Sequence, residues 1–575
     1  MDRRLTPARL VRVNGPLLEV EGLAGVAMSE VVALGASGVP GEVVSIRGTT
    51  VTVQAYEYTG GLAAGDPVAA LGHPLSARLG PDLLGGVFDG LLRPLSGAPT
   101  WLAPDGRPRE VGGTWSWQPR VTEGADLTQG RVLGTLPHGG GPEFRVMVPP
   151  GVDGRVEWLA PPGAYGTRDQ LAVVGGVPVS LTTDWPVRRP RPVRERLASD
   201  EPLLTGQRVL DAVFPLARGG TAAVPGGFGT GKTMLLQQIA KWCAAEVIVY
   251  VGCGERGNEM ADVLAELAEL SDPRTGRRLS ERTVVIANTS NMPMMAREAS
   301  IYTGVTVAEY FRDMGHDAVV IADSTSRWAE ALREFASRAG ALPAEEGYPA
   351  SLPSALAAFY ERAGRVTTLG GESSSVTVIG AVSPPGGDTT EPVTAHTQRF
   401  VRAVWGLDRE LAYARHYPAV AWAGSFSRDA EQLGRWYAHH GDPEWGRRRA
   451  RVTGLLAEAD RLGDLAALVG TGSLPGHERV VLLAGRLLRE GVLQQNALSP
   501  NDAHCTAEKT AALIDAVLAV VDEAEAAVGR GVLASEVEEL DFSPLLRAAA
   551  ESPPDDTHEV LARQDQMLTH VRGLR

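Results

Sequence analysis

The sequence of 575 residues predicts a multidomain protein with an N-terminal β-barrel, an inserted β-rich module, a central α/β domain and a C-terminal α-helical domain. Three patterns predict this order. Short apolar segments between turn residues dominate the first part of the chain, strand-like and helical patterns alternate from about 186 to 430, and helical spacing alone follows from about 431. We place the domains at 1–72, 73–110, 111–185, 186–430 and 431–575, where 73–110 is the start of the α/β region.

Residues 1–72 and 111–185 carry the two β-rich predictions. The strand candidates of the first range are Leu10–Val13, Leu17–Val20, Val31–Leu34, Glu42–Ile46 and Val51–Ala55. Turn-forming residues separate most of these strands, as is typical of a small barrel. In the second range Val and Leu keep alternating between turns such as Pro161-Pro162-Gly163. That alternation favours an inserted β module over the alternative, a long loop.

The central region alternates between buried strands and helices. Thr221–Val224 is a short strand candidate, and Thr233–Ala245 has apolar residues at helical spacing. Further strand candidates are Glu246–Val251, Thr283–Ala287, Ala318–Ala322 and Val376–Val382. Continuous apolar strands joined by helices indicate a parallel sheet that is covered on both faces. Beyond this sheet, Ala507–Val528 and Glu559–Val571 predict helices of the C-terminal domain.

Composition argues against several classes of protein. The formal net charge of −14 argues against nucleic acid as a partner, because a phosphate backbone requires a basic surface. No uncharged apolar run approaches the roughly 18 to 20 residues of a membrane helix, and the first residues lack the apolar segment of a signal peptide. Three cysteines are too few for a disulfide framework. The composition therefore indicates a soluble chain in the cytosol.

A glycine-rich motif between a strand and a helix predicts a nucleotide site. Its residues are Gly226, Gly227, Phe228, Gly229, Thr230, Gly231, Lys232 and Thr233, which match G-x-x-x-x-G-K-[ST]. In this P-loop, backbone N–H groups at a helix N-terminus hold phosphate oxygens, Lys232 reaches the β- and γ-phosphates, and the Thr233 hydroxyl binds Mg²⁺. Lys and Arg total 55, of which only three are Lys, so this position requires a slim point charge. The alternative is a chance match among 67 glycines, which the strand–helix context argues against.

Two carboxylates are placed to act on a bound nucleotide. Asp323 follows the apolar run Ala318–Ala322, and ligands of open α/β sheets gather at the carboxyl ends of strands. It would hold Mg²⁺ through water, and its alternative role is to cap the following helix. Glu255 and Arg256 also follow a strand candidate, where a carboxylate polarises the attacking water and a cation stabilises transition-state charge. Their alternative is a solvated ion pair of the loop, and Glu259 offers the same chemistry one helical turn further on.

Long strings of residues make the chain similar to a known family. They are Leu79-Gly80-Pro81, Asp184-Trp185-Pro186-Val187-Arg188, Leu204-Thr205-Gly206-Gln207-Arg208-Val209, Gly254-Glu255-Arg256-Gly257-Asn258-Glu259, Arg297-Glu298-Ala299-Ser300-Ile301-Tyr302-Thr303-Gly304, Asp323-Ser324-Thr325-Ser326-Arg327-Trp328-Ala329-Glu330 and Leu493-Gln494-Gln495-Asn496-Ala497. With them the chain resembles, over nearly its whole length, the catalytic A subunit of V-type rotary ATPases, in the bacterial and archaeal V/A-type form. The module at 111–185 resembles the extra domain that is missing from the non-catalytic B subunit of the same ring and from the F-type β subunit.

The resemblance implies a function and a set of partners. Such a chain has a RecA-like P-loop domain that hydrolyses or synthesises ATP, with Mg²⁺, in a ring of three A and three B subunits. Central and peripheral stalk subunits couple the ring to a membrane sector that moves H⁺ or Na⁺, so the chain is expected on the cytoplasmic side of the membrane as a peripheral part. The B subunit supplies an arginine in trans, and such arginines are worth about 10³–10⁵ in rate. The chain alone is therefore expected to hydrolyse ATP poorly.

The resemblance also assigns site residues. It places Lys232 and Thr233 on phosphate and Mg²⁺, Glu255 on the lytic water, Arg256 on the γ-phosphate and Asp323 on the metal.

The base pocket follows from the same resemblance. Tyr417 matches an aromatic that stacks on adenine, a contact worth about 1–3 kcal/mol by analogy with nucleic-acid platforms. The usual second aromatic is Leu498 here. That departure predicts a looser base pocket and leaves strict selectivity for ATP open.

Three other functions compete with this interpretation. A hexameric RNA translocase of the same superfamily requires a basic, aromatic barrel, but residues 1–72 contain 5 Arg, no Lys and 7 acidic residues. A nucleotide-binding ring protein without turnover predicts loss of Lys232 or Glu255, and both are present. A secretion-system ATPase is disfavoured by the module at 111–185.

Overall fold

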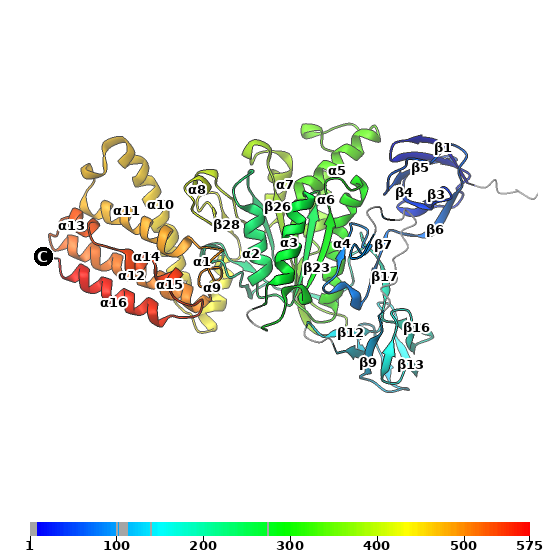
Figure 1. The fold of residues 1–575 in the computed structure, drawn as a ribbon, viewed down its shortest axis with the longest axis horizontal. Helices are drawn as coiled ribbons and strands as arrows, with labels where there is room; N and C mark the ends of the chain where they lie inside the picture. Colours follow the sequence, from blue (N-terminus) through cyan, green and yellow to red (C-terminus); the bar gives the residue numbers. More distant parts are fainter. Residues whose placement is uncertain (1–7, 99–101, 103–112, 138–140, 273–274, 575) are drawn as a thin grey trace, which may run out of the picture. The chain divides into compact units, whose positions relative to one another are not determined.

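The computed structural model describes residues 8–98, 102, 113–137, 141–272 and 275–574. Contacts divide the chain into two compact units, whose elements Figure 1 shows. Unit 1 comprises residues 1–198, 245–381 and 395–397, and unit 2 comprises residues 199–244, 382–394 and 398–575. The α/β region predicted at 186–430 therefore contributes to both units. The predicted boundary between 110 and 111 lies outside the described residues.

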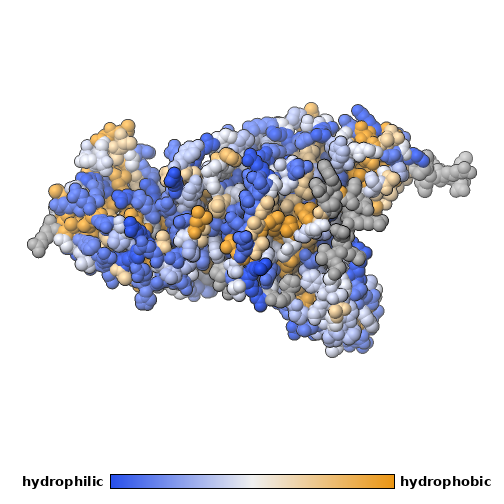
Figure 2. Space-filling model, in the orientation of Figure 1, coloured by the Kyte–Doolittle hydropathy of each residue, from blue (hydrophilic) through white to orange (hydrophobic). Residues whose placement is uncertain are grey.

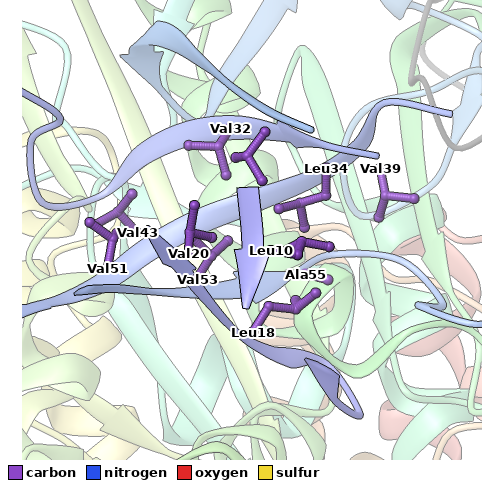
Figure 3. Close-up of a cluster of buried hydrophobic side chains, with 11 residues drawn as sticks. Leu10, Leu18, Val20, Val32, Leu34, Val39, Val43, Val51, Val53 and Ala55 are labelled. Atoms are coloured by element: carbon purple, nitrogen blue, oxygen red, sulfur yellow. The ribbon is translucent and has the colours of Figure 1, made fainter. Parts of the chain in front are cut away.

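Unit 1 begins with the predicted β-barrel. Its strands are β1 (Arg9–Asn14), β2 (Leu17–Glu21), β3 (Glu30–Leu34), β4 (Val39–Arg47), β5 (Thr50–Ala55) and β6 (Val68–Pro74), in the order β1-β2-β5-β4-β3-β6. The sheet closes on itself, because Leu10 N donates to Asp66 O at 2.9 Å and Val68 N donates to Ala8 O at 2.9 Å. Alternate residues of the strands point inward and form one buried aliphatic cluster (Figure 3). The predicted barrel is confirmed.

The inserted β module also lies in unit 1. Its strands are β9 (Trp115–Pro119), β10 (Asp126–Leu127), β11 (Val132–Leu136), β12 (Phe144–Met147), β13 (Gly154–Leu159), β14 (Gly163–Tyr165), β15 (Gln170–Val174) and β16 (Val177–Ser180). They form two four-stranded sheets, in the orders β10-β13-β15-β16 and β12-β11-β9-β14. Trp117 is fully buried, and its indole N–H donates to Ala160 O at 3.1 Å. The alternative of a long loop is therefore wrong, since the segment has a core of its own.

A parallel sheet forms the rest of unit 1. Its strand order is β26 (Ser373–Val382), β24 (Ala318–Asp323), β22 (Val247–Cys253), β23 (Thr283–Asn288) and β8 (Val87–Phe88). The helices between the strands are α3 (Gly257–Glu269), α4 (Met294–Asp313), α5 (Thr325–Arg338) and α6 (Leu352–Tyr360). Strands β25 (Gly364–Thr367) and β18 (Glu195–Leu197) continue antiparallel from β26, and β17 (Thr183–Pro186) pairs with β7 (Ser76–Leu79). Both faces of the central strands are buried, which explains their continuous apolar runs.

Unit 2 contains the strand and helix that flank the glycine loop. Its α/β elements are β19 (Pro202–Leu203), α1 (Arg208–Val213), β20 (Leu216–Ala217), β21 (Thr221–Pro225), α2 (Lys232–Trp242), β27 (Ala403–Val404), α8 (Arg409–Tyr413) and β28 (Phe426–Ser427), while α7 spans Pro392–Phe400. The predicted helix Thr233–Ala245 is wrong at its C-terminal end, where α2 stops at Trp242. Cys243 is extended there, and Ala244 N donates to Leu204 O at 2.8 Å instead of continuing the helix.

The C-terminal part of unit 2 is helical, as predicted. Its helices are α9 (Ala430–His439), α10 (Trp445–Val469), α11 (Gly476–Leu488), α12 (Ala507–Gly529), α13 (Ala534–Glu538), α14 (Ser543–Leu546), α15 (Ala548–Glu551) and α16 (His558–Arg572). Helices α10, α11, α12 and α16 pack side by side (Figure 1). Lys509 is fully buried in α12, and its Nζ donates to Ala549 O at 2.9 Å and Ser552 O at 2.8 Å.

Apolar side chains gather at one end of this helical region. Figure 2 shows them at the tip of the α10–α11 hairpin, where Leu465, Leu468 and Val469 are exposed. Among the helices of the described ranges, none combines the length and the apolarity of a membrane span.

Candidate functional site

The glycine loop of unit 2 has the conformation of an anion cradle. The loop Gly226–Gly231 joins β21 to α2. Gly229 and Gly231 have φ angles of 81° and 83°, in the left-handed region that glycine adopts without the penalty of a Cβ. Inside the loop, the buried Thr230 donates from Oγ1 to Gly227 O at 2.9 Å. The first turn of α2 opens onto this loop, so its N-terminal N–H groups and dipole favour an anion there.

Lys232 is the first residue of α2, and the end of β26 holds its side chain. Its Nζ donates to the Ser383 hydroxyl and lies 3.4 Å from Val382 O. The same carbonyl accepts a hydrogen bond from Gly226 N at 3.1 Å. The beginning of the loop and its lysine are therefore anchored to one corner of the backbone.

An aromatic side chain lies against this loop. A Cβ placed on Gly231 would come within 3.2 Å of Tyr417 Cε1, so the ring packs on the glycine. Tyr417 is 41% exposed, and its carbonyl accepts a hydrogen bond from Gln495 N at 2.7 Å. Leu498, which follows Gln495 closely in the chain, is 87% exposed, and Phe228 in the loop is equally exposed. The structure thus brings Tyr417 to the loop and ties the segment that leads to Leu498 to the Tyr417 backbone.

The predicted carboxylates lie in unit 1, at the carboxyl edge of the parallel sheet. Strands β22 and β24 are neighbours in parallel register, with Gly252 opposite Asp323. The turn that follows β22 is held at both ends, because Gly254 N donates to Asn288 O at 2.7 Å and Ser290 N donates to Glu255 O at 2.9 Å. Glu255 and Asp323 therefore lie at the same edge of the sheet, as the sequence predicted.

Asp323 is the last residue of β24 and is only 1% exposed. The Tyr250 hydroxyl donates to Asp323 Oδ2 at 3.3 Å. Burial first, and then the charges of Asp323 and Glu255, raise the pKa of Tyr250 well above its usual value, so this phenol remains a donor. The helix-cap alternative for Asp323 is wrong, since Ser324 occupies the N-cap position of α5. As donors, the Asp323 carboxylate and the Thr233 hydroxyl are the hard oxygens that Mg²⁺ prefers.

Arg256 is exposed at the start of α3. It is the N-cap residue of that helix, its side chain is 67% exposed, and its Nη1 lies 4.0 Å from Glu259 Oε1. The solvated ion pair that was the alternative for this turn is therefore present, with Glu259 as the partner of Arg256. At this exposure the pair contributes little to stability.

The sequence interpretation missed two arginines beside Glu255. A Cβ placed on Gly254 would lie 2.9 Å from Arg327 Cβ and 3.1 Å from Arg297 Nε, so both side chains pack on this turn. Burial opposes the charge of Arg327, but the hydrogen bond to Glu330 and the charges of Glu330, Glu255 and Glu259 raise its pKa. Both arginines belong to strings that carried the family resemblance, which is the signal that could have found them.

Ser383 was missed as well. It directly follows the strand candidate Val376–Val382, so the rule that ligands gather at the carboxyl ends of strands would have selected it.

Four family models match the chain. They are the ATP synthase alpha/beta family beta-barrel domain at residues 10–72, the ATPsynthase alpha/beta subunit barrel-sandwich domain at 110–188, the ATP synthase alpha/beta family nucleotide-binding domain at 206–427 and the C-terminal domain of V and A type ATP synthase at 434–537. Their order is the order of the four predicted domain types.

Curated relatives match the chain over nearly its full length. The V-type ATP synthase alpha chain of Nitrosococcus oceani is 49% identical over 560 residues, which is 95% of this chain and 94% of that protein. The V-type ATP synthase alpha chain of Anaeromyxobacter dehalogenans is 51% identical and covers 91% of each chain. The corresponding A-type ATP synthase protein of Methanopyrus kandleri, its A subunit, is 47% identical and covers 92% of each chain.

A solved structure shares the fold. The assembled ATPase EscN from the type III secretion system of enteropathogenic E. coli superposes with a TM-score of 0.64 at 22% identity, covering 89% of this chain and 100% of that chain. At this identity the likeness concerns the fold alone.

Proposed function

The chain belongs to the ATP synthase alpha/beta family as a V/A-type catalytic A (alpha) subunit, and from that premise we propose how its residues bind and hydrolyse ATP. One observation carries the proposal. The glycine loop opens α2 with Lys232 anchored at its end and the Tyr417 ring against Gly231. An anion cradle beside an aromatic platform suits the two ends of a nucleoside triphosphate.

The loop half binds the nucleotide. Backbone N–H groups of Gly226–Gly231 and the Lys232 ammonium hold the β- and γ-phosphates, and Tyr417 stacks on the base. Leu498 adds an aliphatic side chain where a second aromatic would hold the base more firmly, so discrimination between bases is weak at that position. The Thr233 hydroxyl and the Asp323 carboxylate would hold Mg²⁺, which neutralises charge on the phosphate oxygens when bound.

The carboxylate half performs the chemistry. Glu255 orients the attacking water and accepts its proton, because its backbone is held at the edge of the sheet. Arg256 exchanges its exposed contact with Glu259 for the γ-phosphate, where a cation stabilises charge that develops in the transition state. The cost of this exchange is small, since an exposed ion pair is worth about 0–1 kcal/mol.

The chain functions as one component of a larger assembly that is peripheral to a membrane. In detail, we place it in a ring of A subunits and non-catalytic B subunits, with each B subunit supplying an arginine to the neighbouring site. Central and peripheral stalk subunits would link the ring, on the cytoplasmic side, to a membrane sector that moves H⁺ or Na⁺. Nucleic acid is not a partner in this proposal, in keeping with the net charge of −14.

Hydrolysis of Mg-ATP by the chain alone and after mixing with its candidate B subunit tests the proposal. The expected gain on mixing is about 10³-fold or more, because the trans arginine completes the site. A heterohexamer by native mass spectrometry should accompany the gain. High activity of the chain alone would contradict the shared site and would point to a ring of identical subunits.

A further inference from the structure

Ser383 stands at a rigid corner beside the glycine loop. It follows the last residue of β26 and precedes Pro384 and Pro385, and a following proline restricts Ser383 to extended backbone. The turn beyond it is also held, because Gly387 N donates to Pro384 O at 3.1 Å and Asp388 N donates to Pro385 O at 3.1 Å. The Ser383 hydroxyl therefore has a defined position with respect to the loop.

The contacts of this corner converge on one side chain. Lys232 Nζ donates to Ser383 Oγ and approaches Val382 O at 3.4 Å, while Gly226 N donates to the same Val382 carbonyl at 3.1 Å. Both acceptors of the ammonium are neutral oxygens, so they orient it without cancelling its charge. A lysine side chain has a flexible four-carbon stem and about 2 kcal/mol of rotamer entropy, so an unguided ammonium would explore many positions.

We propose that Ser383 is a positioning residue, whose hydroxyl aims the Lys232 ammonium at the phosphate chain of the bound nucleotide. An ammonium has three donors, so it can retain Ser383 while it contacts phosphate oxygens. The inference rests on the proposed function, because it presumes that Lys232 binds phosphate. It adds that the orientation of the lysine is set outside the glycine motif, at the end of the strand that carries Val382.

The low lysine content makes this proposal directly measurable. Besides Lys232 the chain contains only Lys241 and Lys509, and both are buried. Acetylation of the native full-length chain at low reagent, followed by peptide mass spectrometry, thus reports on Lys232 with little background. Ser383→Ala removes one acceptor that favours the charged, unreactive ammonium, so the labelling rate of Lys232 should rise about three- to ten-fold. Mg-ATP should suppress labelling in the wild type.

Turnover gives the second readout. In the ring assembled with the B subunit, Ser383→Ala should lower kcat about ten-fold while KM changes less than about three-fold. Ser383→Thr retains the hydroxyl and should restore both the labelling rate and kcat. The matched control is Ser354→Ala, an exposed serine of α6 whose Oγ donates to Ser351 O at 2.9 Å, and it should leave both unchanged.

Two failures are distinguishable. If Lys232→Ala leaves the affinity for Mg-ATP unchanged, the proposed nucleotide site itself is wrong. If Lys232→Ala abolishes binding but Ser383→Ala retains wild-type labelling and kcat, the site stands and the role of Ser383 is overturned. A Ser383→Ala chain that does not assemble is judged by the labelling rate of the chain alone, which needs no partner.

Discussion

The loop half of the site, in unit 2, and the carboxylate half, in unit 1, are built by different means. In the loop half the backbone forms the site, with left-handed glycines, a helix N-terminus and carbonyl or hydroxyl acceptors around Lys232. In the carboxylate half charged side chains form it, with Asp323 and Glu255 at a strand edge and Arg327 packed on the turn. A backbone site tolerates exposure to water, whereas a cluster of charges depends on where each charge lies.

The difference teaches that binding and chemistry should fail separately. Backbone N–H groups and one ammonium attract the phosphates in the ground state as well as in the transition state, so they govern affinity. A general base acts only on the attacking water, so it governs turnover.

The largest expected effect separates the two halves directly. Glu255→Gln should lower kcat of the assembled ring by about 10²–10⁴-fold with little change in the affinity for Mg-ATP, because it removes the proton acceptor and keeps the shape. Lys232→Ala should weaken the affinity instead, because it removes the phosphate-binding charge from the loop. Nucleotide titrations of the chain and steady-state rates of the ring measure the two quantities.

Glu259→Gln is the matched control for this comparison, since Glu259 lies in the turn of α3 that follows Glu255 and pairs with the exposed Arg256. Its effect on kcat should stay within a few-fold. Near-normal turnover of Glu255→Gln, or a loss in Glu259→Gln of equal size, would remove Glu255 from the role of base.

A smaller effect sharpens the description of the loop half. Tyr417→Ala should weaken nucleotide binding by about 1–3 kcal/mol, because the base loses its stacking partner. Leu498→Phe should tighten ATP binding by about 0.5–1.5 kcal/mol through an added aromatic contact, and should raise the preference for ATP over GTP. Competition titrations with ATP and GTP measure both changes. Equal affinities for the two nucleotides in the wild type and in Leu498→Phe would show that this position does not determine base selectivity.

The smallest effect concerns the pH dependence of the loop half. Burial first, and then the charge of Arg489, lower the pKa of His416 from 6.5 to about 4. Because this pKa is lower in the folded chain than in the unfolded chain, protonation favours unfolding. The contribution of His416 is complete above about pH 6.5 and decreases as the pH falls toward 4, by about 1 kcal/mol at pH 5.5.

Urea unfolding at pH 7.5 and pH 5.5 tests this dependence. His416→Gln should reduce the difference between the two unfolding midpoints, whereas His439→Gln, at an exposed position of α9, should leave it unchanged. Identical differences in the wild type and in His416→Gln would contradict the role of this histidine.

Much of the architecture could be predicted because local patterns carry it. The barrel strands follow turn residues, the central strands follow continuous apolar runs, and α12 and α16 match the predicted helices within a few residues. The end of α2 was wrong because a tertiary hydrogen bond from Ala244 to Leu204 ends a helix whose apolar spacing continues. Such a bond joins residues that are far apart in the chain, and a local pattern contains no information about it.

The site shows the same division. The glycine motif was visible because all of its residues are contiguous and each has a conformational or chemical reason within the motif. Arg297, Arg327 and Ser383 were missed because each reaches the site from another strand or helix, and their residue types are common elsewhere in the chain.

By itself, the sequence determined the order of the domains, the phosphate loop and the use of lysine at its end, because periodicity, glycine content and residue scarcity are local properties. Only the tertiary structure decided what surrounds these residues. It placed the Tyr417 ring on Gly231, buried Asp323 beside Tyr250 and seated Lys232 on the corner at Ser383. Each of these contacts joins segments far apart in the chain, so packing and not local propensity selects them.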